Sequence, residues 1–199
     1  SLRLKTVAAL VPFGARVCDI GTDHARLPIY LIQSGIAKSV IAADLREKPL
    51  EKARENIRLA GVLGIDTRLC NGFDGIGAEE FDAAVIAGIG GEVISGIIDR
   101  ADILKNADKL LILQPTTSPE FLRRFLCENG FEIISDTAIC ENKKLYSVMT
   151  ARYTGEKYSC GEEFYYCGRV DPRTEDGAKY IEKQYLRLKK GADAIEDIP

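Results

Sequence analysis

The stretch that decides the fold is RVCDIGTDHARLP, Arg16–Pro28. It opens with a short apolar run, Arg16–Ile20, that is typical of a buried strand, and Gly21 allows a sharp turn at its end. A helix is predicted next, over Leu27–Ile36, because Pro28 suits a first helical turn and a glycine lies near its end. The stretch therefore predicts strand, turn and helix, the first unit of an α/β sheet.

The same alternation continues to Arg152. The predicted strands are Ser39–Asp44, Ile65–Cys70, Phe81–Ala87 and Lys109–Leu113, and the predicted helices are Glu47–Ala60, Glu92–Ala101 and a helix capped by Ser118 that runs to Asn129. Four early strands are near-continuous apolar runs, as in a parallel sheet covered on both faces. The last two, Phe131–Cys140 and Lys144–Tyr153, are joined by a tight turn and must be antiparallel. This pattern is that of the class I methyltransferase fold, a Rossmann-like, mostly parallel α/β sheet of seven strands with a C-terminal antiparallel hairpin.

Length and composition limit the classes of protein. The 199 residues suit one domain with a short appendage, and 46% hydrophobic with 29% charged residues is ordinary for a folded chain. A net charge of -3 excludes a globally basic nucleic-acid coat but leaves room for a local basic patch. No apolar run is long enough to span a membrane. Six cysteines without a CxxC motif and a single histidine predict reduced thiols, a cytoplasmic location and no metal. We expect a monomer and leave a homo-oligomer open.

The loop after the first strand lies where open α/β sheets bind ligands. It lacks the second and third glycines of a dinucleotide-binding motif, and Asp23 would repel a pyrophosphate. These features disfavour NAD and favour a ligand with a cationic amine, such as the methionine part of S-adenosylmethionine (SAM). His24 in this loop is a candidate for cofactor contact or proton transfer, with a purely structural histidine as the alternative.

Four later positions extend the candidate site. Asp44 ends the second strand at about the spacing, roughly 20 residues, that suits an acid holding ribose hydroxyls. Asn71 could bind an adenine edge and Phe73 could pack on its face. Three glycines in Ala87–Gly91 leave room for a methyl acceptor, and Gln114 could contact a polar base edge. Each position also has a purely structural alternative. Asp44 could be a surface acid at a strand end, Asn71–Gly72 an ordinary turn, and Gln114 a turn residue after a strand.

Several of these motifs together resemble the bacterial TrmK family. They are SLRL at Ser1–Leu4, DIGTDHARLP at Asp19–Pro28, Asn71–Gly72, AGIGG at Ala87–Gly91 and LQP at Leu113–Pro115. Members of that family are SAM-dependent methyltransferases that act on N1 of the adenine at tRNA position 22. The resemblance covers essentially the whole chain and implies SAM as cofactor and tRNA as partner. The Asn/Asp-Pro-Pro-aromatic motif of many base-modifying methyltransferases is absent here.

The resemblance and the loops together predict three sets of site residues. The cofactor-binding set is Asp19, Ile20, Gly21, His24, Asp44, Leu45, Asn71, Gly72, Phe73, Ala87, Gly88, Ile89 and Gly90. By resemblance, Asp19, Gly21 and His24 would line the methionine end of SAM. The catalytic candidates are Asp23, His24 and Gln114, and the substrate-binding candidates are Arg26, Arg46, Lys183 and Arg187.

The sequence changes in character after Tyr153. We predict a SAM-binding catalytic domain over residues 1–152 and a C-terminal helical extension over residues 153–199. A helix over Glu175–Lys190 carries a basic stripe of Lys179, Lys183, Arg187 and Lys190, which is either a solvated face or an RNA contact. By resemblance the extension helps to grip tRNA, and it is short enough here to be expected as a truncated form.

The expected reaction needs little acid–base catalysis. N1 of an unpaired adenine has a lone pair, so methyl transfer depends on alignment of the flipped-out base and on electrostatics. Asp23 is the candidate to offset the positive charge that develops on the base. The alternatives are a SAM-dependent methyltransferase of a small molecule or protein, a non-catalytic SAM- or RNA-binding module, and an NAD oxidoreductase.

Overall fold

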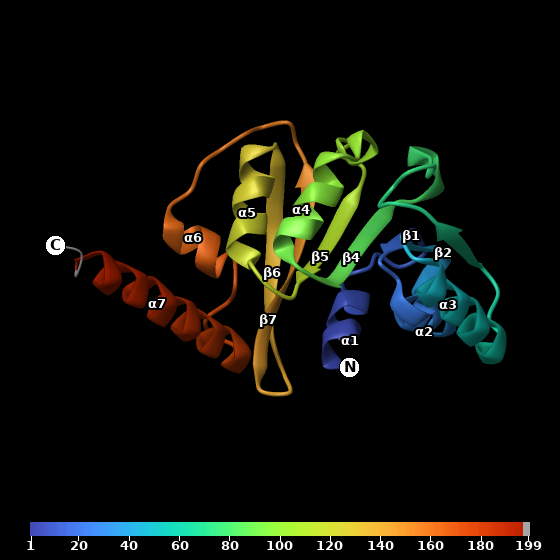
Figure 1. Ribbon diagram of the computed structural model, residues 1–199, viewed down its shortest axis with the longest axis horizontal. Helices are drawn as coiled ribbons and strands as arrows, with labels where there is room; N and C mark the ends of the chain where they lie inside the picture. Colours follow the sequence, from blue (N-terminus) through green and yellow to red (C-terminus); the bar gives the residue numbers. More distant parts are fainter. Residues whose placement is uncertain (197–199) are drawn as a thin grey trace.

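The computed structural model describes the backbone of residues 1–196 and the side chains of residues 1–190. At its centre lies a seven-stranded sheet in the order β3-β2-β1-β4-β5-β7-β6 (Figure 1). The strands are β1 (Ala15–Ile20), β2 (Ala37–Asp44), β3 (Ile65–Leu69), β4 (Ala83–Ile89), β5 (Leu110–Pro115), β6 (Phe131–Glu141) and β7 (Lys144–Tyr153). β7 pairs antiparallel with both β5 and β6, and the other neighbours are parallel. This confirms the predicted class I methyltransferase fold.

Helices cover both faces of the sheet. They are α1 (Leu2–Ala9), α2 (Arg26–Gln33), α3 (Glu47–Ala60), α4 (Gly91–Asp99), α5 (Pro119–Glu128), α6 (Glu162–Cys167) and α7 (Glu175–Glu196), with short 3-10 turns η1 (Asp23–Ala25), η2 (Ala78–Glu80) and η3 (Asp102–Leu104). α1 and α2 bury their apolar sides on one face, and α4, α5 and α6 on the other. β1, β2 and β5 are buried along most of their length, and β4 is buried over residues 83–86, which explains their continuous apolar sequences.

The strand order reverses at β1, whose neighbours are β2 on one side and β4 on the other. Chain connections leave this point in opposite directions, so the loops after β1 and β4 separate and a crevice opens between them. The candidate residues of both loops therefore come to lie at one edge of the sheet.

Over residues 1–153, the boundaries of the predicted elements differ from the predictions by up to three residues, and the end of β4 and the cap of α5 differ for identifiable reasons. β4 continues to Ile89 instead of ending at Ala87, because Gly88 adopts φ +81° in a bulge and pairing with β5 resumes at Ile89. Ser118 precedes α5 but its side chain does not cap the helix. Its φ is +50°, and its Oγ donates to Glu92 Oε1 at 3.3 Å.

Candidate functional site

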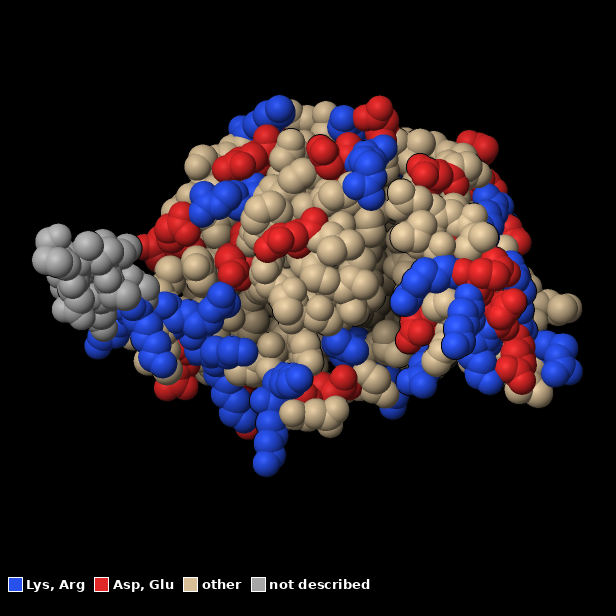
Figure 2. Space-filling model, in the orientation of Figure 1, with Lys and Arg blue, Asp and Glu red and all other residues tan. Residues whose placement is uncertain are grey.

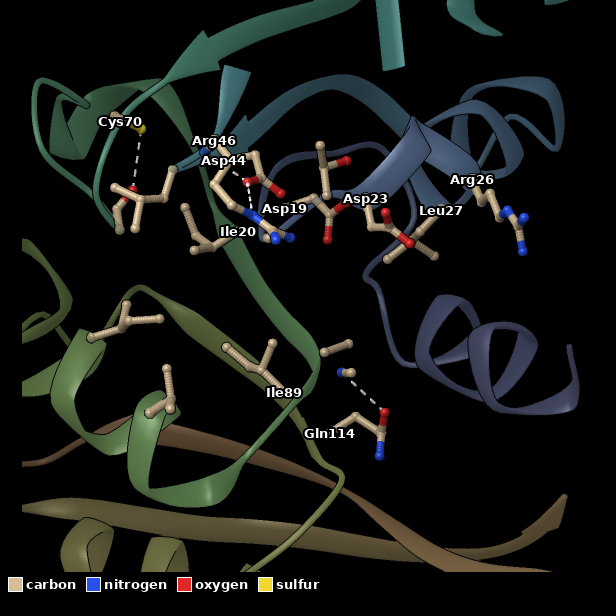
Figure 3. Close-up of a pocket in the computed structure, with 18 of the residues that line it drawn as sticks. Asp19, Ile20, Asp23, Arg26, Leu27, Asp44, Arg46, Cys70, Ile89 and Gln114 are labelled. Carbon is tan, nitrogen blue, oxygen red and sulfur yellow. Dashed lines mark hydrogen bonds and ion pairs between the residues drawn. The ribbon is translucent and has the colours of Figure 1, made fainter. Parts of the chain in front are cut away.

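A cavity of about 750 Å³ opens where β1, β2, β4 and β5 end. This size falls in the range of roughly 300–1,000 Å³ that is usual for small-molecule sites. The residues from the predicted site that line it are Asp19, Ile20, Gly21, Asp23, Arg26, Asp44, Leu45, Arg46, Asn71, Gly72, Ala87, Gly88, Ile89 and Gln114. Figure 3 shows Asp19, Asp23 and Asp44 on one wall, facing Ile89 and Gln114 across the cavity.

The loop after β1 forms the first wall through an unusual backbone. Gly21 has φ +75°, and a Cβ built on it would meet no atom within 4 Å, so the backbone borders open space. Asp23, His24 and Ala25 follow with φ values of 29°, 61° and 54°. Such left-handed residues are costly outside glycine and cluster at functional sites. The side-chain amide of Asn56, on α3, donates to the His24 carbonyl at 2.9 Å and fixes this turn.

Two carboxylates on adjacent strands make this wall acidic. Asp19, near the end of β1, is only 4% exposed, and burial, reinforced by the nearby Asp44, raises its pKa to about 7. Asp44, at the end of β2, is 7% exposed, and its Oδ1 accepts a hydrogen bond from the backbone N–H of Arg46 at 2.9 Å. The wall therefore suits a ligand that brings a cation and hydroxyl donors and disfavours one that brings phosphates.

The opposite wall is held by a side chain from β5. The Oε1 of Gln114 accepts from the backbone N–H of Gly88 at 3.1 Å, and its Nε2 donates to the Pro115 carbonyl at 2.8 Å. Gln114 is 1% exposed, and its amide orientation is set by these two contacts. Gly88 itself has open space where a Cβ would lie. The bulge in β4 and the Gln114 amide thus shape one surface together.

Five predicted site residues do not line the cavity. Phe73 is 7% exposed and packs on Phe81 with ring centroids 5.7 Å apart. Gly90 precedes α4, where a Cβ would lie 2.9 Å from Thr117 Oγ1. His24 borders a separate surface groove beside the mouth. The two others, Lys183 and Arg187, lie on α7.

The structure adds lining residues that the loop patterns did not predict. They are Ser1, Arg3, Leu4, Thr22, Leu27, Cys70, Val93, Ile97 and Arg100. The N-terminus reaches the cavity because Glu141, on the β6–β7 hairpin, accepts hydrogen bonds from Ser1 Oγ at 2.7 Å and Arg3 N at 3.2 Å. This contact joins residues 140 positions apart, and no local pattern could have signalled it. The resemblance of the SLRL motif to the TrmK family was the only sign in the sequence that these residues belong to the site.

The described part of the chain has neither a metal-binding cluster nor a membrane-spanning helix. Its side chains include no group of three or more His, Cys, Asp or Glu residues arranged as a metal site would require. Within the same part of the chain, no helix combines the length and apolar character needed to cross a membrane.

Residues 1–149 match the sequence family described as a methyltransferase domain. Together with the strand order and the cavity at the end of β1, this match defines a class I methyltransferase domain.

Three relatives narrow the class. The tRNA (adenine(22)-N(1))-methyltransferase of Bacillus subtilis is 34% identical over 152 residues, which are 76% of this chain and 64% of that protein. The structure of Sp1610 from Streptococcus pneumoniae, provisionally named a tRNA (m1A22) methyltransferase, is 30% identical with a TM-score of 0.85 and covers 100% of this chain and 89% of that one. A second structure of Sp1610, solved with SAM, is 29% identical with a TM-score of 0.85 and covers 96% of this chain and 90% of that one. M. capricolum TrmK, solved with S-adenosyl-homocysteine, is 26% identical with a TM-score of 0.81 and coverage of 100% and 88%. The chain belongs to the TrmK family of tRNA (adenine(22)-N(1))-methyltransferases.

Proposed function

We propose that this chain is a SAM-dependent methyltransferase that methylates N1 of an adenine in tRNA, at position 22. The observation that carries the proposal is the pair of buried carboxylates, Asp19 and Asp44, that faces the Gly88 bulge across one cavity. The named activity of the relatives supports the choice of tRNA and of the target atom. We place the activity in the cytoplasm, in a monomer, with residues 1–152 as catalytic domain and residues 153–199 as tRNA-gripping extension.

The cavity residues fit SAM by their chemistry. Asp19 would pair with the ammonium of its methionine part, and Asp44 would accept from the ribose hydroxyls. Asn71 and Gly72 line the cavity and would border the adenine, while Phe73 supports that loop from the core. The open backbone at Gly21 lets the ligand approach the chain closely. When bound, SAM supplies an electrophilic methyl group on its sulfonium.

The chain's own part in the reaction is alignment and charge. The N1 lone pair needs no base, so the protein has to hold the adenine in line and exclude water. The carboxylate of Asp23 lies at the cavity mouth and offsets the positive charge that develops on the ring. Gln114 Nε2 donates one hydrogen to the Pro115 carbonyl. That nitrogen has no second partner among the described residues, so its other hydrogen can position the base.

Incubation with methyl-labelled SAM and unmodified tRNA, followed by nucleoside analysis, tests the proposal. We expect labelled 1-methyladenosine that maps to position 22 and is lost in a transcript carrying guanosine there. SAM binding without transfer to any tRNA would contradict the proposal and favour a non-catalytic module. Transfer to a small molecule or a protein in place of tRNA would move the chain to another class of methyltransferase.

A further inference from the structure

A second hollow adjoins the mouth of the cavity. This groove, of about 640 Å³, lies between the η1 turn and the first half of α3 and is called the His24 groove here. Its lining is His24, Arg46, Lys48, Pro49, Glu51, Lys52 and Glu55. Arg46 lines both hollows, and Asp23 lines the cavity while its neighbour His24 lines the groove. The two sites therefore share one wall.

The backbone of His24 is fixed on this shared wall. His24 has φ +61°, Ala25 after it is fully buried, and Asn56 anchors the His24 carbonyl. The side chain itself is 38% exposed, and its Nε2 lies 3.6 Å from Asp23 Oδ1. An aromatic ring carried on this fixed backbone, beside a pocket for a flipped base, offers a stacking surface for a second base.

The cations of the groove are available to a phosphate. Lys48 is exposed and forms no ion pair within the described side chains. Arg46 lies with its Nε 3.9 Å from Asp44 Oδ1, but 76% of its side chain remains exposed. Lys52 is engaged by Glu55 at 2.7 Å, so those two charges compensate each other. Glu51 is the remaining acid of the lining, so the cations of the groove exceed its carboxylates by one charge, while the Asp23 carboxylate lies on the cavity side of the ring.

We propose that the His24 groove binds the RNA nucleotide next to the target adenine, with its base against His24 and Pro49 and its phosphate at Arg46 and Lys48. The proposal rests on the proposed function, because the neighbour of a base flipped into the cavity must leave over the shared wall. Consecutive nucleotides are joined by a phosphate, and the order along the surface is cavity, Arg46, groove. This matches the alternation of base, phosphate and base.

Binding of tRNA in the presence of S-adenosyl-homocysteine tests the groove without requiring catalysis. We expect His24→Ala and Lys48→Glu each to weaken tRNA binding about tenfold, and His24→Phe to retain most of it because a ring remains. Lys38→Glu is the matched control, since this exposed lysine lies near the start of β2, at the opposite edge of the sheet. The dissociation constant for SAM should stay unchanged in Lys48→Glu and Lys38→Glu, and circular dichroism spectra and unfolding midpoints that match the wild type confirm that all four variants are folded.

A tRNA with an abasic nucleotide on either side of the target adenine locates the contact. On one side the abasic change should weaken binding to the wild-type protein about tenfold and should add nothing to His24→Ala, since both remove the same stack. Equal tRNA affinity of the groove variants and the wild type would overturn the inference, even where methylation of tRNA upholds the proposed function. Additive losses on both sides would overturn it as well. A wild-type protein that neither binds nor methylates tRNA would overturn both proposals.

Discussion

Asp19 is a buried carboxyl group, so its charged form is unfavourable unless a cation pairs with it. Burial raises its pKa to about 7, so at pH 6 the free protein holds it mostly protonated and unable to attract an ammonium group. SAM binding should therefore release a proton, and the SAM dissociation constant should be about eightfold higher at pH 6.0 than at pH 7.5. Calorimetry in two buffers of different ionisation enthalpy measures both effects.

The variant Asp19→Asn is the control for this pH dependence. It should bind SAM weakly at every pH, with a flat profile between pH 6.0 and 7.5. The folded-state pKa lies above the ordinary carboxyl value of 3.8, so the folded protein takes up the proton more readily than the unfolded chain. The contribution of Asp19 to stability therefore falls as pH rises from about 4 to 7, and the unfolding midpoint of Asp19→Asn should lack this fall. A wild-type SAM affinity independent of pH would contradict the assignment.

Asp23 stands apart from Asp19 because its carboxylate is 71% exposed and lies at the mouth of the cavity. If it acts on the charge that develops in the base, Asp23→Asn should lower kcat by about tenfold or more and change SAM affinity less than twofold. Steady-state kinetics with tRNA and separate SAM titrations give the two numbers. An unchanged kcat would assign Asp23 to the backbone geometry of the turn alone.

At the residue scale, the sequence predicted which loop each site residue occupies better than it predicted where the side chain points. Asp19, Asp44 and Gln114 follow from their places at strand ends, and all three line the cavity. His24 and Phe73 lie in the right loops but point elsewhere, because a left-handed backbone turns one outward and the pocket around Phe81 buries the other. Side-chain direction depends on backbone angles and tertiary partners that a residue pattern does not contain.

At the element scale, α6 and α7 are joined to the sheet by one buried guanidinium. The Arg123 side chain, on α5, is fully buried and donates to Asp136 Oδ1 at 3.0 Å, to the Tyr165 carbonyl at 2.8 Å and to the Tyr180 hydroxyl at 3.2 Å. It also donates to Ser147 Oγ at 3.0 Å. One side chain thus connects α5, β6, β7, α6 and α7.

Removal of one charge from this cluster should be costly. Asp136→Asn leaves a buried, uncompensated arginine, and we expect a loss of about 3–5 kcal/mol in the free energy of unfolding. Asp171→Asn is the comparison, because it breaks the exposed pair with Arg173 and should leave the unfolding midpoint nearly unchanged. Urea denaturation followed by circular dichroism measures both. Equal midpoints for the two variants would show that the cluster adds no stability.

The elements that were missed share a physical cause. The short helices α1 and α6 have little helical pattern of their own, and α6 is held by Tyr165, which is fully buried against α5 and the sheet. Short helices depend on tertiary packing for their stability, so local propensity gives no signal. By contrast, Glu47–Ala60 was predicted to the residue, since a 14-residue helix closed by Gly61 combines a long amphipathic pattern with a glycine end signal.

At the scale of the whole molecule, the cavity and the basic side of α7 are linked along one edge. Ser1 and Arg3 line the cavity and bind Glu141 of the hairpin, and the backbone N–H of Cys140 next to it donates to Asp176 at the start of α7 at 2.8 Å. Figure 2 shows lysine and arginine side chains gathered over α7 and the hairpin tip, at the lower edge of the view. An acidic protein can therefore present a local basic track over α7 and the hairpin tip.

The two substrate-binding candidates on this track are not equivalent. Arg187 pairs with Glu120 at 2.9 Å and lies over the Tyr166 ring, so its charge is already engaged. Lys183 is exposed and has no ion pair within the described side chains. Lys183→Glu should therefore weaken tRNA binding more than Arg187→Gln, and it should lower the slope of log affinity against log salt by about one. Binding titrations between 50 and 300 mM salt, with Lys38→Glu as control, measure the slopes. Because phosphate contacts release counterions and internal ion pairs do not, equal slopes for Lys183→Glu and the wild type would remove α7 from the tRNA interface, while the cavity and its cofactor chemistry would stand unaffected.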